Sequence, residues 1–416
     1  MLRAGALFIA VAISFVIAVL VSLLITLAFH YKIQNKENLL QKKLERNCKS
    51  AFAILMVDNE QSEGTTVLDL YGEESDSVEI KKMNWGIYEV ASVKAFSGRY
   101  ATTKTKQYGY KPEDNLAVYL ADLSRPLNLC GKTKITGTCY LPEAGVKRGY
   151  IEGKSFEGST LINGQIQNSK NTLPVLDKKI LQSLSEMIAA KFPTGQLFKE
   201  VEISSIDTLI QSFLDTTILI RIAKGGSLSG KYLSGNIIVY GADKLTIDKT
   251  SKLEDVLVFA NSISFSKEFI GNLQAYATDS ILVEEDCILN YPSVLGLFKK
   301  DHKTQQPFIK LMKGAVVKGM VFTTQSELVS DLAKTRVSIE KGARVEGQIY
   351  VDGFADIQGE LWGTVWCQKF LLKTASSVYE NHLLDAVIDR TKLSEHYVGS
   401  AIITSGKKKK TIKWLE

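Results

Sequence analysis

The chain begins with a long apolar segment that carries no formal charge. Residues 4–29 are 26 uncharged residues in succession, and their only polar side chains are those of Ser14, Ser22 and Thr26. About 20 apolar residues are enough to cross the hydrocarbon core of a bilayer as an α-helix. No second run of that length follows in the sequence. The sequence therefore predicts one transmembrane helix over residues 1–29, with the rest of the chain at a membrane surface.

We interpret this segment as an uncleaved anchor whose orientation stays open. A signal peptide usually has an apolar region of about 7–15 residues and a small-x-small cleavage site. The run here is longer and no such site precedes its polar end. The positive-inside rule, read literally, would place the body in the cytoplasm. The reason is that Arg3 is the one basic residue before the run, whereas five follow it, namely Lys32, Lys36, Lys42, Lys43 and Arg46.

Length and charge limit the remaining possibilities. With 416 residues, 45% of them hydrophobic, the chain can form two or three domains with real cores. Basic residues number 51 and acidic residues 45, and four of the lysines form a run at 407–410. Such a run is typical of a solvated, mobile tail. Because the rest of the body is close to neutral, we expect no nucleic-acid partner.

The cysteines do not form a recognisable redox or zinc motif. None of the five stands in a C-x-x-C pair, so neither a zinc ribbon nor a thioredoxin-type site is indicated; they are Cys48, Cys130, Cys139, Cys287 and Cys367. Cys130 and Cys139 could form a disulfide in an oxidising compartment if the backbone brings them together. For most of the five we expect small buried side chains instead.

The periodicity of the sequence changes after the apolar run. Residues 30–60 have apolar residues at helical spacing and no Gly or Pro, which predicts a helical stem. Residues 61–116 contain short alternating segments, such as 77–81 and 85–91, joined by polar turns. This second pattern predicts an antiparallel β-meander with one packed face.

A five-residue pattern, apolar-x-Gly-x-apolar, recurs from about residue 117. Glycine suits a tight corner between strands, where φ is unusual or the backbone approaches too closely for a Cβ. Short alternating strands and only seven prolines accompany the pattern. We therefore favour a parallel β-helix, a solenoid of stacked coils, over an ordinary β-sandwich. The corner glycines are Gly137, Gly164, Gly235, Gly319, Gly347 and Gly359, with related copies at Gly271 and Gly363.

The predicted solenoid is divided by an insertion. We expect it to begin at 117–170 and to continue at 231–378, with a helix-containing insertion at 171–230. Residues 171–192 have apolar residues at helical spacing after Pro174, and this helix should lie on the side or open edge of the solenoid. Residues 379–416 are interpreted as a C-terminal cap, with a helix at 379–385, and a basic tail. The predicted fold class is mainly β, with a transmembrane helix and stem, an antiparallel meander and a parallel β-helix.

The glycine corners, with segments such as 272–276, make residues 232–378 resemble the bactofilin-like, polymer-forming β-helix proteins. Bactofilins are typically small and have no long helical front end, so the chain differs from them there. The resemblance implies a scaffold that assembles end to end and has no active site.

The first 110 residues resemble a different group. The opening at 3–10, the long helix and the following antiparallel meander are similar in layout to type IV pilin-like and pseudopilin-like subunits. Those families usually carry a basic leader and a glutamate just inside the apolar run, and neither is present here. The resemblance implies a body that faces outward from the membrane.

No common catalytic or nucleotide-binding motif occurs in the sequence. It contains no P-loop, Gly-x-Ser-x-Gly elbow, His-Glu-x-x-His or dinucleotide fingerprint. The four histidines, His30, His302, His382 and His396, are scattered. We therefore predict no catalytic, cofactor-binding or metal-binding residues.

Two acidic groups and three tryptophans need separate interpretation. Glu284, Glu285 and Asp286 could ligate calcium through oxygen, but we favour an exposed polar strand edge or turn as the interpretation of this trio. A carbohydrate-active β-helix enzyme would need a carboxylate pair, for which the chain offers Glu346, Asp352 and Asp356; we interpret these as a solvated face. Trp362 and Trp366 are four residues apart and would share one face of a straight strand. We expect them, like Trp85, to be buried.

These patterns predict a single-pass membrane-anchored structural or assembly protein of the cell envelope, and not an enzyme. The pilin-like resemblance implies that it is part of a pilus-like or secretion apparatus. The expected partners are the lipid bilayer and either other envelope proteins or further copies of the chain, with no cofactor. The body is expected on the exported, periplasmic side. Two alternatives remain, a carbohydrate-active β-helix enzyme and a binding module that docks an envelope protein through residues 171–230.

Overall fold

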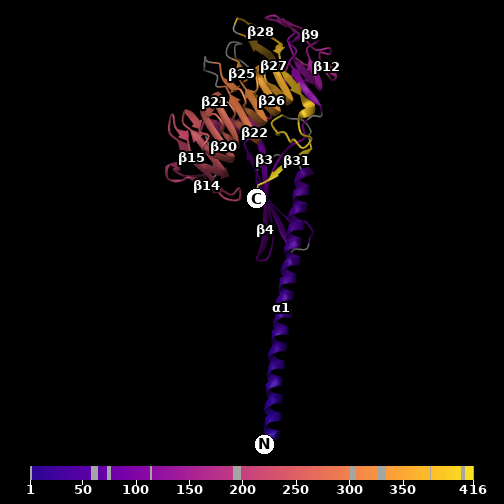
Figure 1. Ribbon diagram of the computed structural model, residues 1–416, viewed down its shortest axis with the longest axis vertical. Helices are drawn as coiled ribbons and strands as arrows, with labels where there is room; N and C mark the ends of the chain where they lie inside the picture. The colour runs from indigo at the N-terminus through magenta and orange to yellow at the C-terminus, as the bar shows by residue number, and fades with distance from the viewer. Residues whose placement is uncertain are drawn as a thin grey trace. The chain divides into compact units, whose positions relative to one another are not determined.

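The computed structural model describes residues 2–57, 64–72, 76–112, 115–190, 198–299, 306–325, 334–374, 376–403 and 408–415. The described chain is mainly β, with one long apolar helix, an antiparallel sheet, a parallel β-solenoid and a second short helix (Figure 1). The predicted fold class is therefore confirmed. Contacts divide the chain into two compact units, Met1–Lys81 with Ser92–Lys104 and Lys82–Ala91 with Thr105–Glu416.

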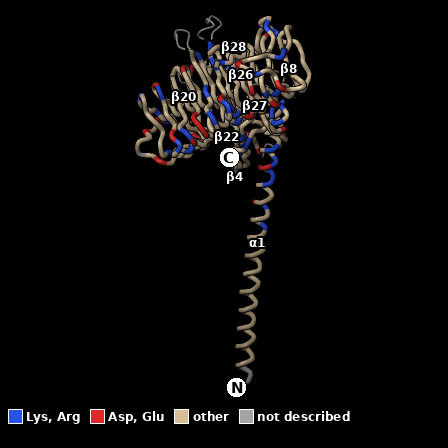
Figure 2. Tube along the Cα trace, turned by 45° about the horizontal axis from the view of Figure 1, so that its top comes forward, with Lys and Arg blue, Asp and Glu red and all other residues tan. Residues whose placement is uncertain are grey.

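The helix α1 (Leu2–Val57) is continuous from the apolar segment into the stem. It is long and apolar enough to cross a membrane, and its apolar window is not buried inside the protein. In Figure 2 the helix is tan, without Lys, Arg, Asp or Glu, from above its grey tip up to the charged residues of the stem. Further along, side chains at helical spacing become buried: Leu44, Cys48, Ala51, Phe52 and Leu55. The predicted helical stem is thus confirmed as far as Val57; its predicted end at 58–60 lies outside the described residues.

The stem packs against strands of its own unit. The Cys48 thiol lies 3.9 Å from the Val93 carbonyl oxygen, and Lys43 Nζ lies 3.2 Å from an Asp76 carboxylate oxygen. The Asn47 side-chain amide also donates to Asp76, whose carboxylate is buried. One helix therefore has a bare apolar half and a packed half.

Five strands form the antiparallel sheet in the order β1-β2-β3-β4-β31. Its first four strands follow one another in the sequence, as the predicted meander requires; they are β1 (Gly64–Leu68), β2 (Ser77–Trp85), β3 (Tyr88–Ser97) and β4 (Tyr100–Tyr110). The fifth strand, β31 (Lys409–Trp414), comes from the C-terminus and pairs antiparallel with β4. The expected solvated basic tail is therefore wrong for 409–410, because these lysines complete the open edge of β4.

The solenoid occupies the chain between β4 and β31. Its strands on the first and last described coils are short, and those between are longer and turn a corner within one strand. They are β5 (Leu116–Leu120), β6 (Leu127–Cys130), β7 (Lys134–Thr136), β8 (Thr138–Leu141), β9 (Val146–Arg148), β12 (Ile166–Asn168), β13 (Phe198–Glu200), β14 (Thr208–Gln211), β15 (Thr217–Ile222), β16 (Ser227–Leu228), β17 (Tyr232–Gly235), β18 (Ile237–Gly241), β19 (Lys244–Ile247), β20 (Lys252–Phe265), β21 (Ile270–Val283), β22 (Ile288–Phe298), β23 (Phe308–Leu311), β24 (Val316–Thr324), β25 (Thr335–Ile339), β26 (Arg344–Ile357), β27 (Glu360–Lys373), β28 (Val378–Glu380), β29 (His382–Leu384) and β30 (Val387–Asp389). A small hairpin joins β10 (Tyr150–Ile151) to β11 (Lys154–Ser155).

The coils do not stack in sequence order. The strand β27 pairs in parallel with β5, β5 with β8, and β8 with β12, so the first coils of the chain lie on top of the last ones. The strands β13 and β14 lie at the other end of the stack (Figure 1). The chain therefore starts the solenoid at one end, crosses to the far end, and builds back toward its starting point.

The segment between β12 and β13, which we call the crossing segment, contains the predicted helix. The helix α2 (Lys178–Ile188) begins after Asp177, whose carboxylate accepts hydrogen bonds from the backbone N–H groups of Lys179 and Ile180. The expected insertion to residue 230 is wrong in its second half, because β13 to β16 are parallel strands of the solenoid. Short apolar strands such as β15 complete coils and do not stand apart from them.

The expected helical cap at 379–385 is also wrong. These residues form β28 and β29, and Leu383 pairs with Leu129 and enters the solenoid core. Seven residues with two adjacent leucines fit a helix or a strand equally well, and the neighbouring coil decides. Irregular residues instead pack against the core at its two ends, Ile203 in the short 3₁₀ turn η1 (Ile203–Ser205) and Leu161 in the loop before β12.

The glycine corners have the predicted cause. Gly319, Gly347 and Gly363 stand in register on three adjacent coils with φ of 144°, 150° and 152°. A Cβ on Gly347 would overlap the carbonyl oxygen of Gly319, and one on Gly363 would overlap that of Gly347. Both reasons for glycine, an unusual φ and a close backbone approach, therefore act together.

We expect Gly347→Ala to lower the free energy of unfolding by about 2–4 kcal/mol, because the methyl group meets the coil below in a strained backbone. Gly230→Ala is the control, since Gly230 also has positive φ (65°) but nothing lies near its missing Cβ. It should cost about 1 kcal/mol. Urea unfolding of the full chain in detergent, followed by circular dichroism, measures both. Equal effects of the two substitutions would contradict the close approach.

Candidate functional site

The solenoid carries a column of aromatic side chains on its outer surface. One residue from each successive coil stands in register along this column. Gly296 interrupts it at β22, where a side chain would overlap the rings of Tyr276 and Phe322. The outer aromatic column consists of Tyr240, Phe259, Tyr276, Phe322, Tyr350, Trp366, Tyr119 and Tyr140.

The crossing segment contacts this column at three coils. Tyrosine hydroxyls donate to its backbone carbonyls, Tyr119 to Thr172 at 3.1 Å, Tyr350 to Pro174 at 2.9 Å and Tyr240 to Ile188 at 3.3 Å. The apolar face of α2, including Leu184 and Met187, belongs to the same buried cluster as the rings. The crossing segment is therefore a strap across the coils, and its helix has its apolar face occupied.

The two tryptophans of β27 have different environments. Trp366 is buried in the outer aromatic column, as expected. Trp362 is only partly buried, and its ring lies 4.2 Å from the Arg344 guanidinium and 5.0 Å from Lys392 Nζ. The expectation that both share one face is wrong, because the corner at Gly363 stands between them.

The turn between β2 and β3 docks on the solenoid within the second unit. Gln274 accepts a hydrogen bond from the Ile87 backbone N–H at 3.0 Å and donates to the Trp85 carbonyl at 2.8 Å. The Trp85 indole N–H donates to the Asp255 carbonyl at 2.7 Å, and its ring meets Phe213 edge-on at 5.2 Å. Trp85 is thus the buried anchor of this turn.

Two ion pairs, one of them buried, hold the C-terminal strand in place. Lys409 Nζ lies 2.9 Å from a Glu89 carboxylate oxygen, with side-chain exposures of 1% and 8%. Lys413 forms a second ion pair with Asp255. Two backbone hydrogen bonds of 2.8 Å join Tyr110 and Gly399, so the chain leaves for the solenoid and returns at one point. Burying a charge pair is costly unless both partners are in place, and the register of β31 is fixed accordingly.

The acidic residues that sequence reasoning singled out are engaged in separate contacts. Asp356 pairs with Arg336 and accepts from Ser338, and Asp352 accepts from Gln368 at 2.6 Å. Glu346 accepts from the Arg344 guanidinium at 2.9 Å. Each of the three carboxylates is thus engaged in a contact of its own.

Two carboxylates of the acidic turn at 284–286 are also engaged in contacts, both with Lys267. Glu284 accepts from the backbone N–H of Lys267, and Glu285 pairs with Lys267 Nζ, both at 3.0 Å. Within the described ranges, no group of three or more His, Cys, Asp or Glu side chains could hold a metal ion. His302 lies outside the described residues.

All five cysteines are free and buried. The possible disulfide between Cys130 and Cys139 is therefore not formed, and the two thiols belong to different buried clusters. Burial raises the pKa of Cys139 to about 12 and, more than any other cause, raises that of Cys287 to about 11. These thiols stay protonated and unreactive at neutral pH.

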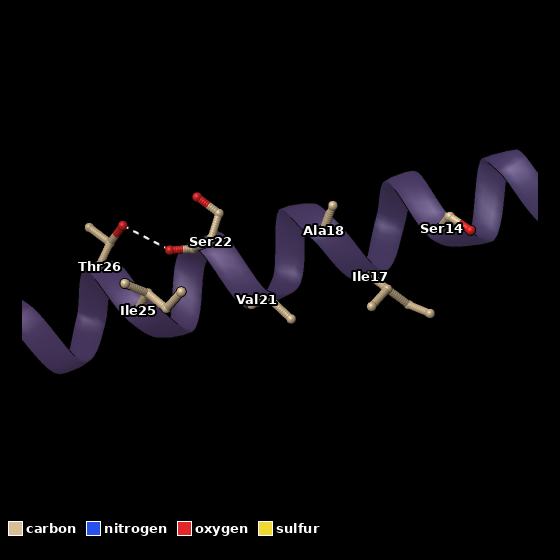
Figure 3. A pocket seen from close by; sticks show the side chains of 7 residues that line it. All are labelled: Ser14, Ile17, Ala18, Val21, Ser22, Ile25 and Thr26. Carbon is tan, nitrogen blue, oxygen red and sulfur yellow. Dashed lines mark hydrogen bonds between the residues drawn. The ribbon is translucent and has the colours of Figure 1, made fainter.

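The apolar half of α1 carries a stripe of small residues that sequence reasoning noted only as polar. Ser14, Ala18, Ser22 and Thr26 recur every fourth residue and form a shallow hollow flanked by larger aliphatic side chains (Figure 3). The Ser14 and Thr26 hydroxyls donate to backbone carbonyls one turn earlier, each at 2.8 Å, so they need no water. Small residues at this spacing let two membrane helices approach closely.

Comparison with known proteins identifies no family for this chain. No protein-family model and no curated protein matches the sequence. Among solved structures, the competence-associated pilin ComZ from Thermus thermophilus is similar, with 11% sequence identity over 85% of this chain and 86% of that chain and a TM-score of 0.27. A TM-score this low does not establish a shared fold.

We expect Lys409→Met to destabilise the second unit by about 3–5 kcal/mol, because Glu89 is left buried without its partner. Replacing both residues, as Lys409→Met with Glu89→Met, should recover most of that loss. Lys408→Met is the matched control, since Lys408 is exposed, and it should have little effect. Urea unfolding of the full chain measures all three, and equal losses from the two single variants would contradict the buried pair.

Thiol counting tests the state of the cysteines. In the native full chain a polar maleimide should label none of the five buried cysteines, and after denaturation without reductant it should label all five. Raising the pH from about 7 to about 9 should not change the native result, because all five thiols are buried away from the reagent and burial raises their pKa. A denatured count of three, five minus one bridged pair, would show that a disulfide forms after all.

Proposed function

We propose that the chain is a single-pass, membrane-anchored assembly protein that holds a β-solenoid beside the membrane and has no catalytic role. One observation carries the proposal, namely that α1 is a single helix with a bare apolar half and a packed half. A soluble protein would not leave that apolar surface in water. The carboxylates Glu346, Asp352 and Asp356 are each engaged in a structural contact, which supports a non-enzymatic role.

The N-terminal layout supports membership of a pilus-like or secretion apparatus. A long apolar helix followed by an antiparallel sheet is the arrangement that the pilin-like resemblance implied. The small-residue stripe on α1 supplies a surface for a second membrane helix. We accordingly propose the lipid bilayer and other envelope proteins, or further copies of this chain, as partners, with the body on the exported side.

Assembly through the ends of the solenoid has less support. The terminal strands β12, β13 and β14 have only three or four residues, and irregular segments pack against the core beside them. Short, covered edge strands are a common protection against edge-to-edge pairing. We therefore assign assembly to α1, and we do not carry forward the end-to-end polymerisation that a bactofilin-like scaffold would imply.

The anchor can be tested by charge substitution. Val16→Arg with Leu20→Arg should move most of the protein out of the carbonate-resistant membrane fraction, because each charge at the helix centre costs about 2.5–3.5 kcal/mol. Leu39→Arg, on the exposed stem surface, should leave it there. Equal membrane retention of the two variants would contradict a transmembrane role for α1.

The orientation of the body needs a second experiment. Labelling of Lys244→Cys in intact cells by an impermeant thiol reagent reports on which side of the membrane the body lies, since the native cysteines are buried.

A further inference from the structure

We propose that three cations at the foot of the first unit, Lys32, Lys36 and Arg99, bind the phosphate groups of anionic phospholipids. We call these residues the cation collar. The inference rests on the proposed membrane anchoring and adds a lipid preference to it. The three residues are exposed, and all of them belong to the first unit.

The two lysines stand within side-chain reach of the headgroup layer expected next to the apolar run. An α-helix rises 1.5 Å per residue, so Lys32 stands about 5 Å and Lys36 about 10 Å beyond Phe29, the last residue of the apolar run. The headgroup layer on each side of a bilayer is about 5–7 Å thick. Lysine side chains can extend back toward that layer while their aliphatic stems cover apolar surface. In Figure 2 the charged residues of α1 begin above its long tan stretch.

The hairpin between β3 and β4 brings the third cation close to the height of Lys36. The Tyr100 hydroxyl donates to a Glu37 carboxylate oxygen at 3.0 Å and accepts a hydrogen bond from the Arg99 guanidinium at 2.9 Å. The Arg99 guanidinium also lies 5.0 Å from the centre of the Tyr100 ring. Because Glu37 follows Lys36 directly, these contacts hold Arg99 about 12 Å from the end of the apolar run.

The balance of charge at this height is positive. Glu37 is the only acidic residue between positions 30 and 44, and the hairpin segment 95–102 contains none. Two other basic residues of the stem are used within the fold, Lys43 with Asp76 and Arg46 over the Tyr71 ring. The Debye length at physiological salt is about 8 Å, so the cation collar lies within reach of charged headgroups.

A flat array of headgroups suits this arrangement better than a soluble anion. The three cations project from two chain segments at similar heights, and none of the described pockets has them among its lining residues. Juxtamembrane Lys and Arg residues each strengthen contact with an anionic leaflet about fivefold. We therefore expect a preference for anionic over zwitterionic lipid that grows with the number of collar residues retained.

The test reconstitutes the full chain in phosphatidylcholine vesicles with trace spin-labelled phosphatidylglycerol or spin-labelled phosphatidylcholine. Electron paramagnetic resonance then gives the fraction of each lipid that the protein restricts in motion. We expect phosphatidylglycerol to be preferred by at least about fivefold, the contribution of one juxtamembrane cation, and the preference to vanish at about 1 M salt, where the Debye length is about 3 Å. Excess inorganic phosphate should have no effect beyond its ionic strength.

Lys32→Gln with Lys36→Gln and Arg99→Gln should abolish the preference. The matched control removes three exposed lysines of the second unit, Lys134, Lys179 and Lys244, and should retain it. A preference that is missing in the native chain, or that survives in the collar variant, overturns the inference. Flotation of the same samples with the vesicles separates the two proposals, because a chain that fails to float contradicts the anchor itself.

Discussion

The pairing of β27 with β5 is the contact on which the rest of the structure depends. It joins residues more than two hundred positions apart in the sequence, and it closes the solenoid onto its own beginning. The Ala121 N–H donates to the Cys367 carbonyl at 3.1 Å, and the Thr364 hydroxyl donates to the Leu116 carbonyl at 2.6 Å. Because of this closure the chain emerges beside the point where it left the antiparallel sheet, and β31 can complete that sheet.

Two cores stabilise this arrangement on either side of one layer of strands. Inward residues such as Val345, Leu361 and Val365 fill the solenoid, and the outer aromatic column forms the second core beneath the strap. The strap is needed because a column of exposed rings would otherwise be a large apolar surface in water. The solenoid fixed in this way has its entry and exit points side by side, at Tyr110 and Gly399.

Local patterns predicted the features that local chemistry determines. The uncharged run, the helix at 178–188 and the glycine corners all depend on spacing or on a missing Cβ within a few residues. Coil order was beyond such reasoning, since any parallel strand of similar length can stack on any other. The predictions of a helix at 379–385 and of a solvated lysine tail were wrong for the same reason. At 379–385 a distant strand decides between helix and strand. At Lys409 the distant carboxylate of Glu89 decides between an exposed and a buried lysine. The separation of Trp362 from Trp366 required knowing that the strand bends at Gly363.

Coil order is the most direct test of this account. Lys134 and Val387 face each other across β7 and β30, although 253 positions separate them in the sequence. Cysteines at these two positions in the full chain should form a disulfide on mild oxidation, because neighbouring strands lie about 4.8 Å apart. Mass spectrometry of the proteolysed protein would identify the bridged peptides. If the coils instead followed the sequence, these positions would stand on distant coils, no such bridge would form, and the closed solenoid would be contradicted.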